Sequence, residues 1–287
     1  MKTDSRFERI FLATDGSESS EAAVNATIAI AKSPTVRVKV AHVWNLELRH
    51  RHGHWDVEVR SEAENLVDET VMRLLKAGVI AEREIIRADT NHVAAAIAVQ
   101  AAEFEADLIV IGSRGLSDWQ SLTQQSVGHQ LVCAVNCPVL IARGTPGADC
   151  NGKVLMAIAG ADDVEPAARA AVAAAHPDGS VMVVHISEAI AGFRGFVYVE
   201  SPDEIRKSMA QACELIGDAG VKVQGMVAHQ GPVAAAVAEI AKDWNADLIV
   251  IGSSRMGDIG SLFLGSASHD LLHMTDRPVL IAERVPA

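Results

Sequence analysis

The chain has 287 residues, of which 49% are hydrophobic, 22% are charged and 4% are aromatic. This length predicts two domains, each large enough to bury its own core. The net charge of −12 argues against binding to a nucleic-acid backbone, which needs clustered Lys and Arg. The first residues lack the apolar run of a signal peptide, and no apolar run approaches the roughly 20 residues of a membrane span. We therefore expect a cytoplasmic protein that contacts neither nucleic acid nor membrane.

Three blocks of sequence recur, identical or nearly so, 140 positions later in the chain. The repeated blocks, each with its second occurrence, are 93–98 (233–238), 106–113 (246–253) and 137–142 (277–282). Three collinear matches at one offset indicate an internal duplication. Between the copies, residues 144–152 read G-T-P-G-A-D-C-N-G, which is typical of a linker. We expect domain 1 at 1–144, a linker at about 145–151 and domain 2 at 152–287.

Short apolar runs, typical of buried strands, alternate with amphipathic stretches in both copies. In the first copy strands are expected at 9–14, 36–43, 79–87, 107–111 and 138–142, with a polar excursion at 44–56. The second copy has strands near 153–158, 181–186, 221–228, 247–251 and 278–282. This alternation predicts an α/β fold of two tandem, open, doubly wound, five-stranded parallel sheets. Ligand sites in such sheets lie beyond the carboxyl ends of the strands.

Two polar segments follow expected strands of the first copy. Asp15-Gly16-Ser17 comes after the first strand, where a carboxylate can accept hydrogen bonds from ribose hydroxyls and Gly16 allows a sharp turn. The same residues also suit helix capping without any ligand, and the sequence leaves both interpretations open.

The second polar segment is a loop after the fourth strand. It reads Gly112-Ser113-Arg114-Gly115, then nine residues, then Gln125-Ser126-Val127 at the start of a helix. Small residues at both ends of a loop before a helix can form a nest of N–H groups for phosphate. The second copy reads Gly252-Ser253-Ser254-Arg255, then nine residues, then Gly265-Ser266.

With these motifs the chain resembles the universal stress protein family in its tandem form. In ATP-binding members this loop is G-x-x-G, nine residues, then G-[S/T], with an Asp at the end of strand one. The resemblance implies that ATP or ADP binds here, with adenine near Val43, ribose at Asp15 and phosphates near Gly115 and Ser126. The implied ligand-binding residues are Asp15, Val43, Gly112, Ser113, Arg114, Gly115, Gln125, Ser126, Val127, Gly252, Ser253, Gly265 and Ser266. The family resemblance also implies that the two copies pair through their last strands as an internal pseudo-dimer. A further homodimer of the whole chain stays open.

Three residues depart from the family pattern. Gln125 replaces its third glycine in the first copy, Arg255 replaces its second glycine in the second copy, and Ala159 replaces the Asp there. We therefore expect nucleotide in domain 1 before domain 2. The alternative is a nucleotide-free scaffold that acts through protein contacts or binds another small ligand.

No catalytic constellation is visible in the sequence. Ser113 and Ser253 lie outside any G-x-S-x-G motif, and the Walker pattern is absent, so we expect no enzyme activity. His50, His52 and His54 alternate as metal ligands can, but no Cys or paired acids lie nearby, and we expect a solvated loop without metal.

Overall fold

The computed structural model divides the chain into two compact units, Phe7–Thr145 and Pro146–Ala287. The described residues are 6–44, 49–51, 54–56, 59–89, 92–113, 127–144, 152–159, 161–187, 189–192, 195–198, 201–228, 232–252 and 266–282. The expected linker at 145–151 therefore lies outside the described residues.

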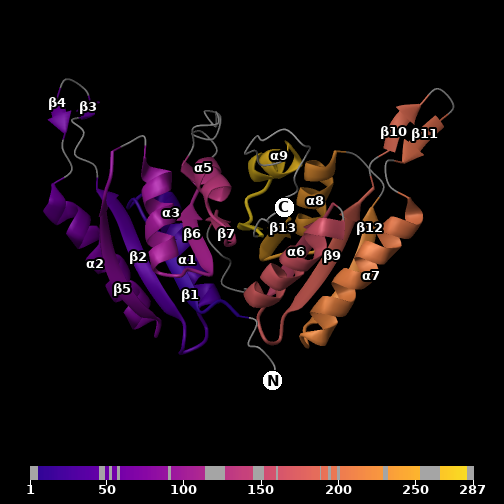
Figure 1. The fold of residues 1–287 in the computed structure, drawn as a ribbon, viewed down its shortest axis with the longest axis horizontal. Coiled ribbons are helices and arrows are strands. Elements are labelled where there is room, and N and C mark those ends of the chain that lie inside the picture. The colour runs from indigo at the N-terminus through magenta and orange to yellow at the C-terminus, as the bar shows by residue number, and fades with distance from the viewer. Residues whose placement is uncertain are drawn as a thin grey trace. The chain divides into compact units, whose positions relative to one another are not determined.

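Within the described residues, each unit contains a five-stranded parallel sheet with helices on both faces and a two-stranded hairpin (Figure 1). The first unit contains, in chain order, β1 (Arg9–Ala13), α1 (Glu18–Ile30), β2 (Arg37–Trp44), β3 (Arg49–Arg51), β4 (His54–Asp56), α2 (Arg60–Lys76), β5 (Ile80–Arg87), α3 (Val93–Glu103), β6 (Leu108–Gly112), α5 (Val127–Ala134) and β7 (Val139–Ala142). The second contains β8 (Lys153–Ile158), α6 (Ala161–Ala174), β9 (Ser180–Ile186), β10 (Ala189–Gly192), β11 (Gly195–Tyr198), α7 (Pro202–Asp218), β12 (Lys222–Ala228), α8 (Val233–Asp243), β13 (Leu248–Ile251), α9 (Ser266–Met274) and β14 (Val279–Ile281).

Both sheets have the same strand order. It is β7-β6-β1-β2-β5 in the first unit and β14-β13-β8-β9-β12 in the second, and neighbouring strands within each unit pair in parallel. The predicted α/β fold with two five-stranded parallel sheets is thus confirmed. The order reverses between β1 and β6 and between β8 and β13, which is where open α/β sheets bind their ligands.

The middle of each sheet is apolar on both faces. Ile10, Phe11 and Leu12 of β1 are fully buried, because helices cover both of its sides. A strand covered on both faces reads as a continuous apolar run rather than an alternating one. Helix α1 turns small side chains toward the sheet, including the buried Ala22 and Ala26, which lets it approach the strands closely.

The two units also repeat each other in backbone conformation. Helices α3 and α8 are each followed by a non-glycine residue of positive φ, Glu105 at 54° and Asn245 at 55°. Helices α2 and α7 are followed by Gly78 and Gly220, with φ of 82° and 83°. Positive φ at matching helix ends shows that the duplication has kept its local geometry as well as its strand order.

A short antiparallel hairpin lies between the second strand and second helix of each unit. These hairpins are β3–β4 and β10–β11. Where the β3–β4 hairpin lies, the sequence predicted only a polar excursion. Where the β10–β11 hairpin lies, it predicted no element. Strands of three or four residues are too short to show a hydrophobic period, so the sequence does not distinguish them from loop.

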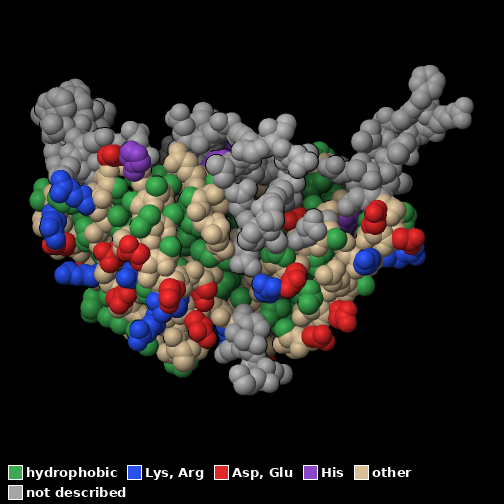
Figure 2. All heavy atoms as spheres, viewed as in Figure 1, with side chains coloured by type: hydrophobic (Ala, Val, Ile, Leu, Met, Phe, Trp, Pro, Cys, Tyr) green, Lys and Arg blue, Asp and Glu red, His purple; other side chains and the backbone are tan. Residues whose placement is uncertain are grey.

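The surface of the described residues is mixed in charge. Figure 2 shows acidic and basic side chains interspersed on the face that it draws. No helix among the described residues is long and apolar enough to cross a membrane.

Candidate functional site

The first-copy residues singled out at the strand ends lie at one edge of the sheet. Ala13 of β1 is the parallel partner of Ile111 of β6. The residues that follow each strand, Thr14 to Ser17 and Gly112 to Ser113, therefore leave the sheet next to each other. This edge is the point of strand-order reversal in the first unit.

Asp15 closes the turn between β1 and α1. Its Oδ1 accepts hydrogen bonds from Ser17 N at 3.1 Å and from Ser17 Oγ at 2.5 Å. The Ser17 carbonyl accepts in turn from Ser20 Oγ at 2.7 Å. The carboxylate therefore stabilises the turn before α1, whereas the cap residue of the helix, Ser17, makes no side-chain capping hydrogen bond. Asp15 is also exposed at the sheet edge, where its carboxylate can be reached by a ligand.

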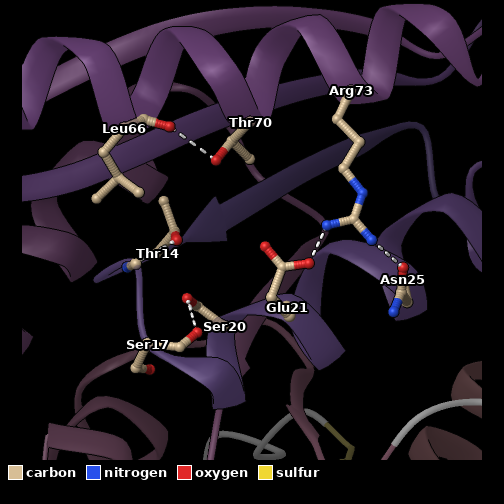
Figure 3. Close-up of polar contacts among 9 residues, drawn as sticks. Thr14, Ser17, Ser20, Glu21, Asn25, Leu66, Thr70 and Arg73 are labelled. Carbon is tan, nitrogen blue, oxygen red and sulfur yellow. Dashed lines mark hydrogen bonds and ion pairs between the residues drawn. The ribbon is translucent and has the colours of Figure 1, made fainter.

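Helix α2 supports this turn from outside. Gly16 has a φ of 73°, and a Cβ added there would lie 2.9 Å from Leu66 Cδ1 of α2. Figure 3 shows Leu66 reaching down from α2 toward the turn. Farther along the same two helices, Arg73 pairs with Glu21 of α1 and donates to Asn25 Oδ1 at 2.6 Å. The turn that carries Asp15 is thus held between α1 and α2.

Gly112 is a point of close backbone approach. A Cβ at this position would lie 2.4 Å from Ser19 O and 2.8 Å from Ser20 N. The first turn of α1 therefore packs directly on the end of β6, and any side chain at 112 would force the two apart. This packing explains the glycine without a ligand, and nothing in the spacing of the sequence indicated it.

Ser113 and Arg143 form a buried polar pair beside Gly112. Arg143 follows β7, and its Nε donates to Ser113 Oγ at 3.1 Å. Each residue is 6% exposed. Ser113 was expected at the site, but Arg143 was missed, because the two residues lie 30 positions apart and meet only through the pairing of β6 with β7.

Most of the expected phosphate loop lies outside the described residues. The positions concerned are Arg114, Gly115, Gln125, Ser126, Ser253 and Gly265. Val127 begins α5 and is exposed, and Ser266 begins α9. A Cβ at Gly128 would lie 3.3 Å from Ile111 Cδ1, so the first turn of α5 lies over the end of β6.

The second unit differs at the equivalent edge. When β1 and β8 are aligned at their first residues, Ala159 matches Asp15 and Asp163 matches Ser19. A Cβ at Gly252 would lie 2.6 Å from both Cβ and Cγ of Asp163 and 3.0 Å from its Oδ1. A carboxylate therefore packs against the first glycine of the second loop, where the first unit has main-chain atoms.

A histidine that the sequence reading missed lies beneath the turn. His42 of β2 is buried, and its Nδ1 donates to the Thr14 carbonyl at 2.8 Å. His185 has the same place in β9 and is also buried. Val43, the expected adenine contact, is half-buried and points to the opposite face of the sheet from His42. Ile186, its counterpart, is buried.

No group of three or more His, Cys, Asp or Glu within the described part of the chain can hold a metal ion. His50 and His54 belong to the β3–β4 hairpin, and His52 lies outside the described residues. The described cysteines, Cys133, Cys137 and Cys213, are not in disulfides. Burial raises the pKa of the Cys213 thiol, which keeps it protonated.

Comparison with known proteins identifies the family. The profile of the universal stress protein family matches residues 6–143 and 151–283. A universal stress protein of Thermus aquaticus is 34% identical over 131 residues, which cover 45% of this chain and 96% of that protein. One from Mycobacterium tuberculosis is 25% identical over 291 residues, covering 96% and 97% of the two chains. The crystal structure of a universal stress protein from Archaeoglobus fulgidus has the same fold, with a TM-score of 0.71, 21% identity and 96% coverage of both chains. The chain therefore belongs to the universal stress protein family and carries two of its domains in tandem.

Proposed function

We propose that the first unit binds ATP or ADP at the carboxyl ends of β1 and β6, and that the chain acts by binding rather than by catalysis. One observation carries the proposal. The atoms nearest to a Cβ at Gly112 are main-chain atoms of α1, whereas those nearest to a Cβ at Gly252 belong to the Asp163 carboxyl group. An anionic ligand is therefore disfavoured by a neighbouring carboxylate in the second unit but not at the equivalent glycine of the first.

The first unit offers suitable partners for each part of a nucleotide. Asp15 is exposed at the edge of the sheet and carries oxygen acceptors for ribose hydroxyls. Helix α5 begins at the same edge, since its first turn lies over Ile111 at the end of β6. The free N–H groups and the dipole at such a helix start favour phosphate. A nucleotide that spans from Asp15 to α5 can place its ribose at Asp15 and its phosphates at the start of α5.

The second unit lacks these features. Ala159 has no acceptor for a ribose, and the Asp163 carboxylate adds a negative charge at the loop. We infer that this unit is free of nucleotide and serves protein contacts or another small ligand.

A binding role is favoured over a hydrolytic one by the surroundings of Ser113. Its hydroxyl accepts a hydrogen bond from Arg143. A guanidinium stays protonated in proteins and so cannot act as the general base that a serine nucleophile requires.

The experiment is native mass spectrometry combined with calorimetry on the full chain. We expect one nucleotide per chain. Asp15→Ala should weaken ATP binding by about 0.5–1.5 kcal/mol, or roughly two- to tenfold, because a ribose hydrogen bond is lost. Glu69→Ala is the matched control, since it removes one exposed carboxylate from α2, and it should leave the affinity unchanged.

A chain that binds no nucleotide, or a nucleotide whose binding is insensitive to Asp15→Ala, would refute the proposal. Gln125→Gly separately tests whether the Gln125 side chain obstructs the phosphates. Restoring the glycine of the family pattern should tighten ATP binding, and weaker binding would show that the Gln125 amide is itself a phosphate ligand.

A further inference from the structure

Arg143 lies at the same sheet edge as the proposed nucleotide site but belongs to no part of the glycine pattern. It directly follows β7, and its Nε is 3.1 Å from the Oγ of Ser113, the second residue of the G-S-R-G segment. Ser113 N donates to the Ala142 carbonyl at 2.9 Å, so the two chain segments stay in register beyond the strands. A buried guanidinium is thus fixed where the phosphate loop leaves the sheet.

Arg143 and the start of α5 lie over the same face of the sheet. Side chains two positions apart on a strand share a face, so Ser113 lies on the face of Ile111. The hydrogen bond to Ser113 places the Arg143 side chain on that face too. The first turn of α5 also covers Ile111, as the contact at Gly128 requires. The guanidinium charge and the positive end of the α5 dipole therefore lie at one edge and on one face.

A cation in this position affects anions more than neutral groups. A guanidinium keeps its charge at any physiological pH, and burial reduces the screening of its field by water. Its interaction with a ligand then grows with the negative charge of that ligand. Adenosine and ribose are neutral, whereas a triphosphate carries more charge than a monophosphate.

We propose that Arg143 makes the first unit select nucleotides by the charge of their phosphate chain, favouring ATP and ADP over AMP. The inference rests on the proposed nucleotide site and assigns its specificity to a residue outside the glycine pattern. The repeat adds a contrast between the copies, because the position that matches Arg143 in the second copy is Glu283. The charge at this position is thus reversed between the two copies.

The test compares ATP, ADP and AMP binding by calorimetry in the full chain. Arg143→Met keeps an apolar stem in the buried position and removes the charge. We expect it to lower ATP affinity by about tenfold or more and AMP affinity by less than about threefold, because charge-assisted contacts to the longer phosphate chain are lost. Arg143→Lys restores the charge and should recover most of the preference for ATP.

Two further variants complete the design. Arg83→Gln removes a cation that pairs with Asp68, so it changes the net charge equally and should leave all three affinities unchanged. Ser113→Ala removes the hydrogen bond but keeps the cation, and ATP affinity should fall by less than about threefold.

The outcomes separate this inference from the proposed function. Absence of ATP binding to the wild-type chain overturns both. If the wild type binds ATP, then equal losses for ATP and AMP in Arg143→Met, or no loss for either, overturn the role of Arg143 alone. A Ser113→Ala loss as large as that of Arg143→Met also overturns it, since Arg143 would then only position the loop. If Arg143→Met fails to fold, Arg143→Lys decides: a retained ATP preference supports the inference, and an equal loss for all nucleotides refutes it.

Discussion

The residues of the repeated A-D-L-I-V-I-G-S segment have two separate physical roles. Asp107, at the amino end of β6, accepts hydrogen bonds from two main-chain N–H groups at the start of β1. Asp247 does the same for Lys153 N at 2.9 Å in the second unit. Gly112, at the carboxyl end, provides the close approach of α1. The segment therefore maintains the β1–β6 pairing at one end and the shape of the site at the other.

The first prediction concerns the pH dependence of stability through Asp107. Burial raises the pKa of its carboxyl above the ordinary value of 3.8, although the N–H groups of Glu8 and Arg9 oppose the shift. The folded protein therefore holds the proton more tightly than the unfolded chain. The contribution of Asp107 to stability is full below its unfolded pKa and is lost as the pH rises through the folded pKa.

Asp107→Asn removes this titration. The unfolding free energy of the variant relative to the wild type should increase as the pH rises from below 3.8 through the raised pKa of the folded protein, measured by urea unfolding at each pH. A relative stability that decreases over this range would contradict the direction of the pKa shift.

At the scale of elements, the β1–α1 turn is shaped by contacts with a helix distant in sequence. Its own hydrogen bonds, from Ser17 to Asp15, are local. Its position also depends on α2, which covers Gly16 through Leu66. The stability of α2 packing and the geometry of the proposed ribose contact are therefore linked.

The second prediction follows from that link. Leu66→Ala removes the contact over Gly16 and should destabilise the chain by about 1–3 kcal/mol, less than for a fully buried leucine. It should also weaken ATP binding, because the turn that carries Asp15 loses its support. Leu75→Ala on the same helix is the control, since Leu75 is 46% exposed, and it should cost no more than about 0.5 kcal/mol. Equal effects of the two variants on ATP binding would refute the link.

At the scale of the whole molecule, the two units share a fold but differ in chemistry. Their sheets have the same order, and their helix ends have matching φ values. The strand ends carry Asp15 and Arg143 in the first unit but Ala159 and Glu283 in the second, and the first helix carries Ser19 in the first unit but Asp163 in the second. Duplication has thus preserved the residues that pack the fold, whereas the residues at the carboxyl edge of the sheet have diverged.

The third prediction tests whether Asp163 excludes nucleotide from the second unit. Asp163→Ser installs the residue of the first copy, Ser19, and removes the carboxylate from Gly252. We expect calorimetry to show a second, weaker ATP-binding event in the variant, with the first unchanged. Asp218→Ser, at the end of α7, removes a distant carboxylate of the same unit and should add no such event. Unchanged stoichiometry in Asp163→Ser would show that Asp163 is not the excluding group.

The sequence by itself determined the duplication, the five strands of each copy and the family. These properties depend on the hydrophobic period of each segment and on blocks that recur at a constant offset. Both can be read along the chain without knowing which residues are in contact. It also placed Asp15 and Gly112 at strand ends, since the carboxyl end of a strand can be read from where an apolar run stops.

Only the tertiary structure decided what these residues contact. Arg143 reaches Ser113 because β7 pairs with β6, and Asp163 covers Gly252 because the first turn of α6 packs on the end of β13. His42 reaches Thr14 in the same way, through the register of β1 with β2. Sequence spacing carries no record of such contacts, because they depend on strand order and register, which are set by the packing of the whole unit.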